Sequence, residues 1–226
     1  MYWDSTIIIL IPAIIFSIVA QIMVKSAFSE YSKVRNSRGL TGADAAREIL
    51  DRNGLTNVRI EHISGSLTDH YDPKANVIRL SDDVYGSATV AAVGVAAHEA
   101  GHAVQYAEGY YPIKIRNAII PVTRFGSSLS TPLVILGLAL SWDFLITAGI
   151  LLFCAVVLFQ AITLPVEFNA SGRALKTLRS SHFLEDDEMK GARSVLTAAA
   201  MTYVAAMLSA LLSLVRLLVI SGRRRR

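Results

Sequence analysis

Residues 6–24 read TIIILIPAIIFSIVAQIMV, an apolar run without a single charged residue. A helix needs about 20 mostly apolar residues to cross the hydrocarbon core of a bilayer, so this run predicts a membrane span. The preceding residues, MYWDS, carry an acid and no base, which is the wrong charge for the start of a cleaved signal peptide. We therefore expect residues 1–24 to be a retained N-terminal membrane anchor.

Three further apolar runs follow this anchor. Residues 118–140 and 144–164 are separated only by the turn SWD, and so short a connection predicts an antiparallel hairpin that crosses the membrane and returns. Residues 195–220 form the last run, which is interrupted by Arg216, a long side chain that can reach toward one interface. The expected fold class is a multi-pass α-helical membrane protein with about four transmembrane helices and a small α/β domain.

The composition agrees with this fold class and excludes several others. The chain is 53% hydrophobic and 18% charged, whereas soluble domains are roughly 25% charged. A single cysteine, Cys154, lies inside a predicted span, which excludes a disulfide scaffold. The net charge of +4 comes without a basic stripe interleaved with aromatic residues, and no GxxxxGK[ST] loop is present, so neither nucleic acid nor a nucleotide is expected as a partner.

Residues 25–117 are the only long stretch with the composition of a soluble domain. Capping and turn residues predict, in order, a helix over 41–51, short strands over 57–63 and 76–80, and a helix over 87–106. The strand over 76–80, directly before the last helix, is a candidate edge for pairing with an extended substrate, and an ordinary internal strand is the alternative.

The last of these helices carries the motif His98-Glu99-Ala100-Gly101-His102. Residues four apart share one face of a helix, so the two imidazoles can bind one Zn²⁺ at about 2.0–2.1 Å. Glu99, one residue along, can take a proton from the water that zinc activates and pass it to the leaving amine. The motif therefore predicts one catalytic zinc ion. The plainer interpretation is a pair of core histidines that only make hydrogen bonds.

A catalytic zinc needs a third protein ligand and an open position. We expect Glu167 as this ligand, because two membrane crossings return the chain to the face that it left, beside the helix of His98 and His102. Glu108 lies on that same helix, too close in sequence, and His182 is a weaker rival.

The polar turn LTDHYDP precedes the zinc helix. In this turn His70 or Tyr71 could donate to the substrate oxyanion, although ordinary turn chemistry explains the residues equally well.

Lys and Arg residues near the span ends indicate which side is cytoplasmic. Basic residues follow the first span, precede the hairpin and fill the segment after it, and with four spans these three groups share one side. That side is predicted to be cytoplasmic, which places the N-terminus outside. The tail Arg223–Arg226 then also falls outside, although Lys and Arg residues normally lie on the cytoplasmic side, unless the apolar run at 195–220 does not cross the membrane. The expected organisation is a membrane anchor at 1–24, a cytoplasmic zinc-peptidase domain at 25–117, the hairpin at 118–164, a cytoplasmic segment with the third zinc ligand at 165–194, and a C-terminal membrane helix with the arginine tail at 195–226.

Five pieces of this sequence together resemble the YugP-like family of bacterial membrane zinc metallopeptidases: the N-terminal anchor, LTDHYDP, NVIRLS, VAAHEAGHAVQ and LPVEFNAS. The resemblance extends over about residues 1–220 and implies a neutral zinc peptidase of the bacterial cell membrane. A zinc helix followed by a later Glu after a membrane hairpin is also similar to the HtpX-type gluzincins. In those proteins an Asp four residues after the ligand Glu supports a zinc-ligand His. Ser171 occupies that position here, so we expect this support from Asn169 or the backbone.

The leading hypothesis is a membrane-embedded zinc endopeptidase that acts at the cytoplasmic face of the cell membrane. Its expected partners are the lipid bilayer, a peptide or protein substrate that is unfolded or membrane-bound, and other membrane proteins. One alternative is an intramembrane protease of the site-two type, with the zinc helix inside the bilayer. Another is a non-catalytic scaffold whose zinc is closed by a fourth ligand such as His182.

Overall fold

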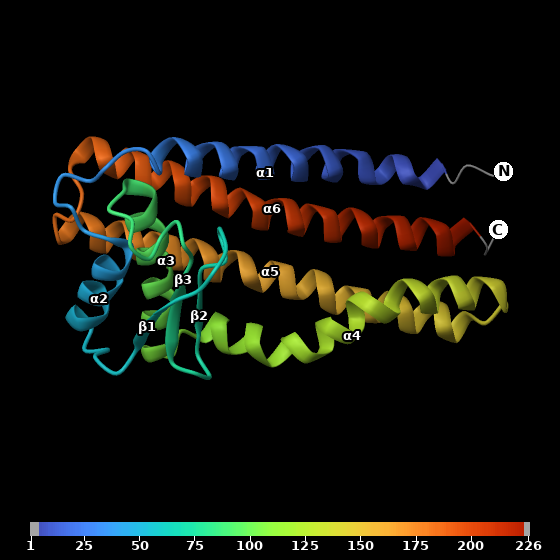
Figure 1. The fold of residues 1–226 in the computed structure, drawn as a ribbon. Helices are drawn as coiled ribbons and strands as arrows, with labels where there is room; N and C mark the ends of the chain where they lie inside the picture. Colours follow the sequence, from blue (N-terminus) through green and yellow to red (C-terminus); the bar gives the residue numbers. More distant parts are fainter. Residues whose placement is uncertain (1–4, 224–226) are drawn as a thin grey trace. The chain divides into compact units, whose positions relative to one another are not determined.

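The computed structural model describes residues 5–223, which form helices and one small sheet (Figure 1). In chain order the elements are η1 (Ser5–Leu10), α1 (Ile11–Tyr31), α2 (Gly42–Arg52), β1 (Arg59–His62), β2 (His70–Asp72), β3 (Val77–Leu80), α3 (Val90–Ala107), α4 (Tyr111–Ala139), α5 (Asp143–Ser180) and α6 (Asp186–Arg223). The acidic N-terminal segment at residues 1–4 and residues 224–226 of the arginine tail lie outside the described residues.

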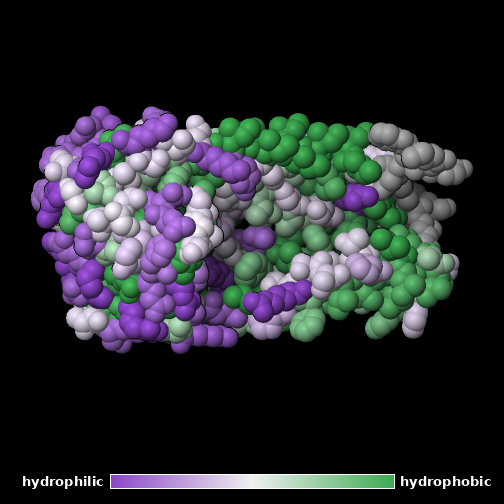
Figure 2. All heavy atoms as spheres, in the orientation of Figure 1, coloured by the Kyte–Doolittle hydropathy of each residue, from purple (hydrophilic) through white to green (hydrophobic). Residues whose placement is uncertain are grey.

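Four helices in the described chain are long and apolar enough to cross a membrane: Ser5–Tyr31, Tyr111–Ala139, Asp143–Ser180 and Asp186–Gly222. The predicted fold class is therefore confirmed. Exposed isoleucines line α1, which appears as a hydrophobic strip in Figure 2. A strip of this kind suits contact with lipid, because apolar side chains on the outside of a helix are stable in a bilayer.

Each of these helices extends beyond its apolar run. α4 begins at Tyr111 rather than at 118, and α6 begins at Asp186 rather than at 195. α5 continues through Pro165 to Ser180, whereas the predicted membrane span ends at residue 164. Hydrophobicity marks only the part of a helix that meets lipid, so the polar turns of the same helix carry no such signal.

The described chain forms two compact units, and the described part of the first comprises residues 5–20, 111–165 and 202–223. In this unit α4 and α5 form the predicted hairpin with their backbones close together. A Cβ added to Gly149 would lie 2.7 Å from the carbonyl oxygen of Ser130, and one added to Gly126 would lie 2.8 Å from that of Leu152. Small residues at such contacts allow membrane helices to pack closely.

Polar contacts also join the two ends of the chain within this unit. The hydroxyls of Ser17 and Ser209 lie 3.3 Å apart, between α1 and α6. Arg216, which we expected to reach toward an interface, donates from Nε to the hydroxyl of the buried Thr6 at 3.1 Å. A hydrogen bond of this kind satisfies a polar group in a span that would otherwise face apolar surroundings.

The second unit comprises residues 21–110 and 166–201 and contains the sheet. The strand order is β1-β3-β2, with β1 parallel and β2 antiparallel to β3. The expectation that the strand over 76–80 offers a free edge is wrong, because β3 is the central strand. The strand β2 was not predicted, because it has only three residues and lacks the apolar alternation that marks a half-buried strand.

The helix that carries HEAGH is the central helix of the second unit. Thr89, rather than Ser87, caps α3 by accepting a hydrogen bond from the Ala92 amide. Most of its side chains are buried, and it packs against α2 and the sheet. α3 is not among the helices of residues 5–223 that are long and apolar enough to span a membrane.

Candidate metal centre

The two histidines of the motif lie on one face of α3. Residues 98 and 102 are one helical turn apart, and their rings meet edge to face with centroids 4.7 Å apart. Their side chains are 14% and 12% exposed, so a small ligand can reach ring atoms that are otherwise buried. The ring nitrogens of such partly exposed imidazoles can bind a metal ion in place of water.

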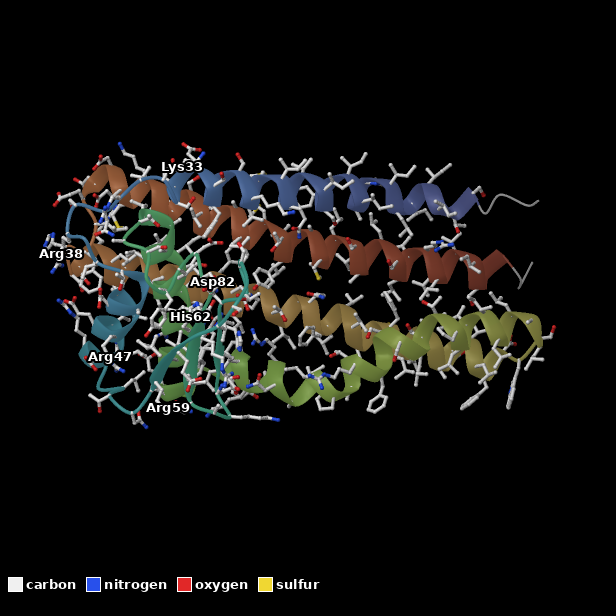
Figure 3. All side chains as sticks on the ribbon, in the orientation of Figure 1. Lys33, Arg38, Arg47, Arg59, His62 and Asp82 are labelled. Carbon is white, nitrogen blue, oxygen red and sulfur yellow. The ribbon has the colours of Figure 1, made fainter. Side chains whose placement is uncertain are left out.

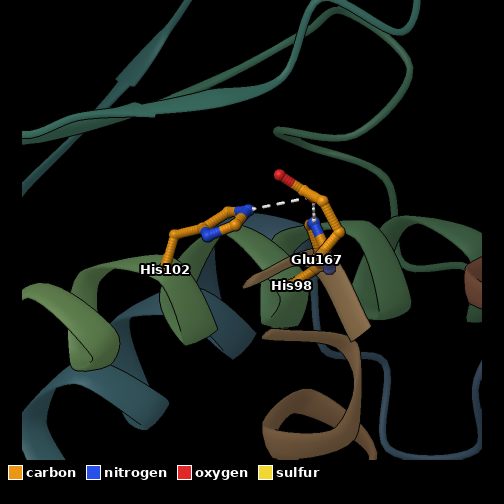
Figure 4. Close-up of side chains that lie close together, drawn as sticks. All are labelled: His98, His102 and Glu167. Atoms are coloured by element: carbon orange, nitrogen blue, oxygen red, sulfur yellow. Dashed lines mark ion pairs between the residues drawn. The ribbon is translucent and has the colours of Figure 1, made fainter. Parts of the chain in front are cut away.

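Glu167 comes to the same place from α5 (Figure 4). Its Oε2 lies 3.3 Å from Nε2 of His98 and 3.4 Å from Nε2 of His102. Zinc bonds of about 2.05 Å that meet at the tetrahedral angle place neighbouring ligand atoms about 3.3 Å apart. The three side chains therefore fit a zinc ion in both donor type and spacing.

Gly101, inside the motif, allows α5 to approach α3. A Cβ at this position would lie 2.8 Å from the carbonyl oxygen of Ala170, which is closer than side-chain carbons approach backbone oxygen. Ala170 follows Glu167 by about one helical turn. The missing side chain of Gly101 thus permits the short distance from Glu167 to the two imidazoles.

Side chains behind the two histidines hold their rings. The Ser171 hydroxyl lies 3.1 Å from Nδ1 of His98, and Oε1 of Gln105 lies 3.0 Å from Nδ1 of His102. Our expectation that support would come from Asn169 or the backbone instead of Ser171 is wrong for His98. A serine hydroxyl can occupy the place of a carboxylate because it also accepts a hydrogen bond from an imidazole N–H. The contact of Gln105 with His102 was not predicted, because the only signal for it in the sequence is a polar residue on an Ala-rich helix.

Glu99 is tied to the sheet rather than to the metal-ligand cluster. It is 8% exposed, and its Oε2 accepts a hydrogen bond of 2.9 Å from the backbone amide of Tyr71 on β2. The Tyr71 hydroxyl donates to Asn76, and burial raises the pKa of its phenol. This places the Tyr71 backbone next to the proposed base, although its hydroxyl is engaged elsewhere.

The other residues that the sequence suggested as ligands or oxyanion donors do not belong to the cluster of possible metal ligands. His70 is exposed, and its ring contacts the Thr68 carbonyl oxygen and Arg79. Glu108 forms an ion pair with Arg173 at 2.6 Å. Among residues 5–223, the cluster of possible metal ligands around His98 contains only His102 and Glu167 besides it, and the exposed His182 is not part of it.

Among the five histidines, His62 lies on β1 and faces solvent, where it contacts Asp82 at 2.6 Å (Figure 3). It belongs to the exposed surface of the sheet.

The protonation of His102 is set by its surroundings. Burial lowers the pKa of its imidazole, but hydrogen bonding to Glu167 and the charges of Glu99 and Glu167 outweigh burial and raise that pKa above its usual value. The cluster therefore favours a positive charge beside the Glu167 carboxylate, and a divalent metal ion can take the place of that proton.

Four helices that are long enough to span a membrane, and a His-His-Glu cluster formed by the HExxH helix α3 together with α5, are the features of a membrane metallopeptidase. The chain belongs to the family described as "Putative neutral zinc metallopeptidase", which matches residues 6–222. It is 49% identical over 214 residues to the "Putative membrane protease YugP" of Bacillus subtilis (strain 168), and the alignment covers 95% of each chain. No solved structure matches the chain. The family resemblance drawn from the motifs is thus confirmed.

Proposed function

We propose that this chain is a membrane-embedded zinc endopeptidase that hydrolyses peptide bonds of membrane or membrane-associated proteins at the cytoplasmic face of the cell membrane. One observation carries the proposal: Oε2 of Glu167 lies 3.3 and 3.4 Å from the two imidazole nitrogens, the spacing of zinc ligands. Glu99, adjacent in sequence to His98, supplies the general base.

The chemistry follows from the position of each side chain. Bound zinc polarises the scissile carbonyl and lowers the pKa of water toward about 7. His98, His102 and Glu167 would hold the ion, and three protein ligands would leave it open to the reactants. The Tyr71 amide fixes Oε2 of Glu99, so that Oε1 takes the proton from the attacking water and delivers it to the leaving amine.

The substitution Glu99→Gln tests this mechanism. We expect the purified variant to bind one zinc ion per chain as the wild type does, while cleavage of an unfolded casein-type substrate falls by at least about 10²-fold, the range of general base catalysis. Metal content by elemental analysis and cleavage by gel assay provide the two readouts. Full activity of Glu99→Gln would remove the mechanism, and a wild type that binds zinc without cleaving would favour the scaffold alternative.

The sequence puts the third proposed ligand next to a membrane span. Glu167 follows the apolar run of residues 144–164 by only three positions. Because a run of this length is what the hydrocarbon core requires, we expect the ligand close to the membrane surface. We therefore propose that the scissile bond lies close to the membrane, within a juxtamembrane segment of the substrate.

A series of membrane-anchored substrates tests this depth. Each carries the same cleavable segment, separated from a single membrane helix by spacers of about 2, 8, 16 or 30 residues, and is reconstituted with the enzyme in lipid vesicles. We expect cleavage to be fastest with the short spacers, because a distant segment must fold back to reach the centre. Equal rates for all spacers would overturn the depth argument without affecting the zinc chemistry.

The cytoplasmic location rests on the distribution of basic residues. Lys25, Lys33 and Arg38 follow the first span, and further Lys and Arg residues occupy positions 173–193, in the same unit as the metal centre. Single-cysteine variants test it in whole cells after Cys154→Ser. A membrane-impermeant thiol reagent should label Trp142→Cys and should not label Lys74→Cys until the cells are opened; the reverse pattern would place the centre outside.

A further inference from the structure

We propose that Gln105, Asn169 and Arg173 form a hydrogen-bonded chain that positions His102 as a metal ligand, which rests on the proposed zinc-peptidase function. These three residues are called the His102 support chain. They are positioning residues, because they act on the proposed metal site through His102 rather than on the substrate.

Donor and acceptor identities can be read along the support chain from its outer end. A guanidinium group only donates, and Nε of Arg173 lies 2.7 Å from Oδ1 of Asn169, so the Asn169 amide must present its oxygen here. Nε2 of Gln105 donates to the same oxygen at 2.9 Å. It also donates to the backbone carbonyl of Val166 at 2.8 Å. Two acceptors thus fix which way the Gln105 amide points.

The orientation of Gln105 determines the tautomer of His102. With its nitrogen committed to α5, Gln105 can present only its oxygen to Nδ1 of His102, at 3.0 Å. In the neutral imidazole, which is the form that binds a metal, Nδ1 must then carry the proton, and Nε2 keeps its lone pair. This Nε2 is the atom that lies 3.4 Å from Oε2 of Glu167, so the support chain presents the correct nitrogen to the metal.

Burial makes this arrangement rigid. Gln105 is fully buried, and a buried amide without hydrogen-bond partners is costly, which opposes any rotation that breaks its hydrogen bonds. Gln105 belongs to α3, whereas Val166 and Asn169 belong to α5 on either side of Glu167. The support chain therefore joins the two helices that supply the three proposed ligands.

Arg173 anchors the outer end. Its Nη1 lies 2.6 Å from the Glu108 carboxylate, and its guanidinium lies over the Tyr110 ring at 5.9 Å from the centroid. Arg173 and Asn169 line a cavity of about 630 Å³ between α2, α3 and α5. Lys176 lines the same cavity without contributing to the support chain, so it offers a matched control on the same helix.

Zinc affinity of the purified full chain, measured in detergent by competition with a chromogenic chelator, tests the proposal. We expect Gln105→Leu to weaken zinc binding about 10–100-fold, as is typical for loss of a group that orients a ligand. Arg173→Met should cause a smaller loss, since the Val166 carbonyl still orients Gln105. Gln105→Glu restores an acceptor for Nδ1 and should recover part of the affinity lost in Gln105→Leu. Lys176→Met should bind zinc as the wild type does.

The visible absorption of the Co²⁺-substituted protein gives a second readout that a purely structural role would not change, because it reports the donor strength of the bound imidazole. We expect the band of Arg173→Met to shift and that of Lys176→Met to match the wild type. If Gln105→Leu does not fold, Arg173→Met and Asn169→Leu carry the test. Wild-type zinc affinity in these variants, or an equal loss in Lys176→Met, would overturn the support chain; a wild type without zinc would instead overturn the proposed function.

Discussion

The substitution Gly101→Ala tests whether the close approach of α3 and α5 forms the metal centre. The new Cβ would lie 2.8 Å from the carbonyl oxygen of Ala170, whereas ordinary contacts begin near 3.4 Å. Backbone has to move by about 0.6 Å to relieve this contact, three times the tolerance of about 0.2 Å for a metal–ligand distance. Since Glu167 lies about one turn before Ala170, the shift should draw its carboxylate away from the imidazoles.

Gly94→Ala on the same helix is the control, because its Cβ would meet the Ala192 side chain at an ordinary 3.5 Å. Both changes gain up to about 1 kcal/mol of helix propensity, so only the clash distinguishes them. We expect Gly101→Ala to weaken zinc binding roughly tenfold or more, and Gly94→Ala to leave it unchanged, in chelator competition. Circular dichroism of the metal-free proteins checks that both variants fold. Equal zinc affinity of folded Gly101→Ala and wild type would refute the reasoning.

Three further outcomes follow from the same geometry. Glu167→Ala should lower zinc content to background while His182→Ala retains one zinc per chain, as elemental analysis of both variants will show; normal zinc in Glu167→Ala would contradict the ligand set. Zinc must displace the proton that His102 retains because of its raised pKa. The apparent zinc affinity should therefore fall about tenfold for each pH unit below that pKa and level off above it. A zinc affinity that stays constant from pH 5 to 8 would exclude this competition. Removal of zinc by a chelator should abolish cleavage reversibly. The helical circular dichroism should stay unchanged, because the second unit has its own core of apolar side chains around α2 and α3. Loss of helicity would instead show that the metal is needed for folding.

Local patterns accounted for most of the fold. The apolar runs predicted all four long helices, and the capping box at Thr41 appears in the structure with both of its hydrogen bonds. These features depend on residues close in sequence, so a linear pattern contains the necessary information. The strand β2 was missed, since its pairing with β3 depends on a partner rather than on its own three residues.

The continuation of α5 through Pro165 could not be read from sequence either. Proline inside a helix removes one hydrogen bond and costs about 3 kcal/mol, which makes a helix end the natural expectation. Beyond Pro165 the helix belongs to the second unit and buries Val166, Ala170, Ala174 and Leu178 there. Apolar burial of this size, about 1.5–3 kcal/mol for a fully buried Val or Leu, outweighs the loss at a single position.

The metal centre shows why a five-residue motif predicts less than a site. HEAGH identifies two imidazoles and a base, and counting membrane crossings points to Glu167. Neither pattern states that Gly101 must lack a side chain for α5 to come close, or that Gln105 must be present to select the nitrogen of His102. Both requirements arise from contacts between segments more than 60 residues apart. The chemistry of the centre therefore depends as much on the α3–α5 contact as on the motif, and a chain that keeps HExxH but has a bulkier residue in place of Gly101 should form a poorer metal site.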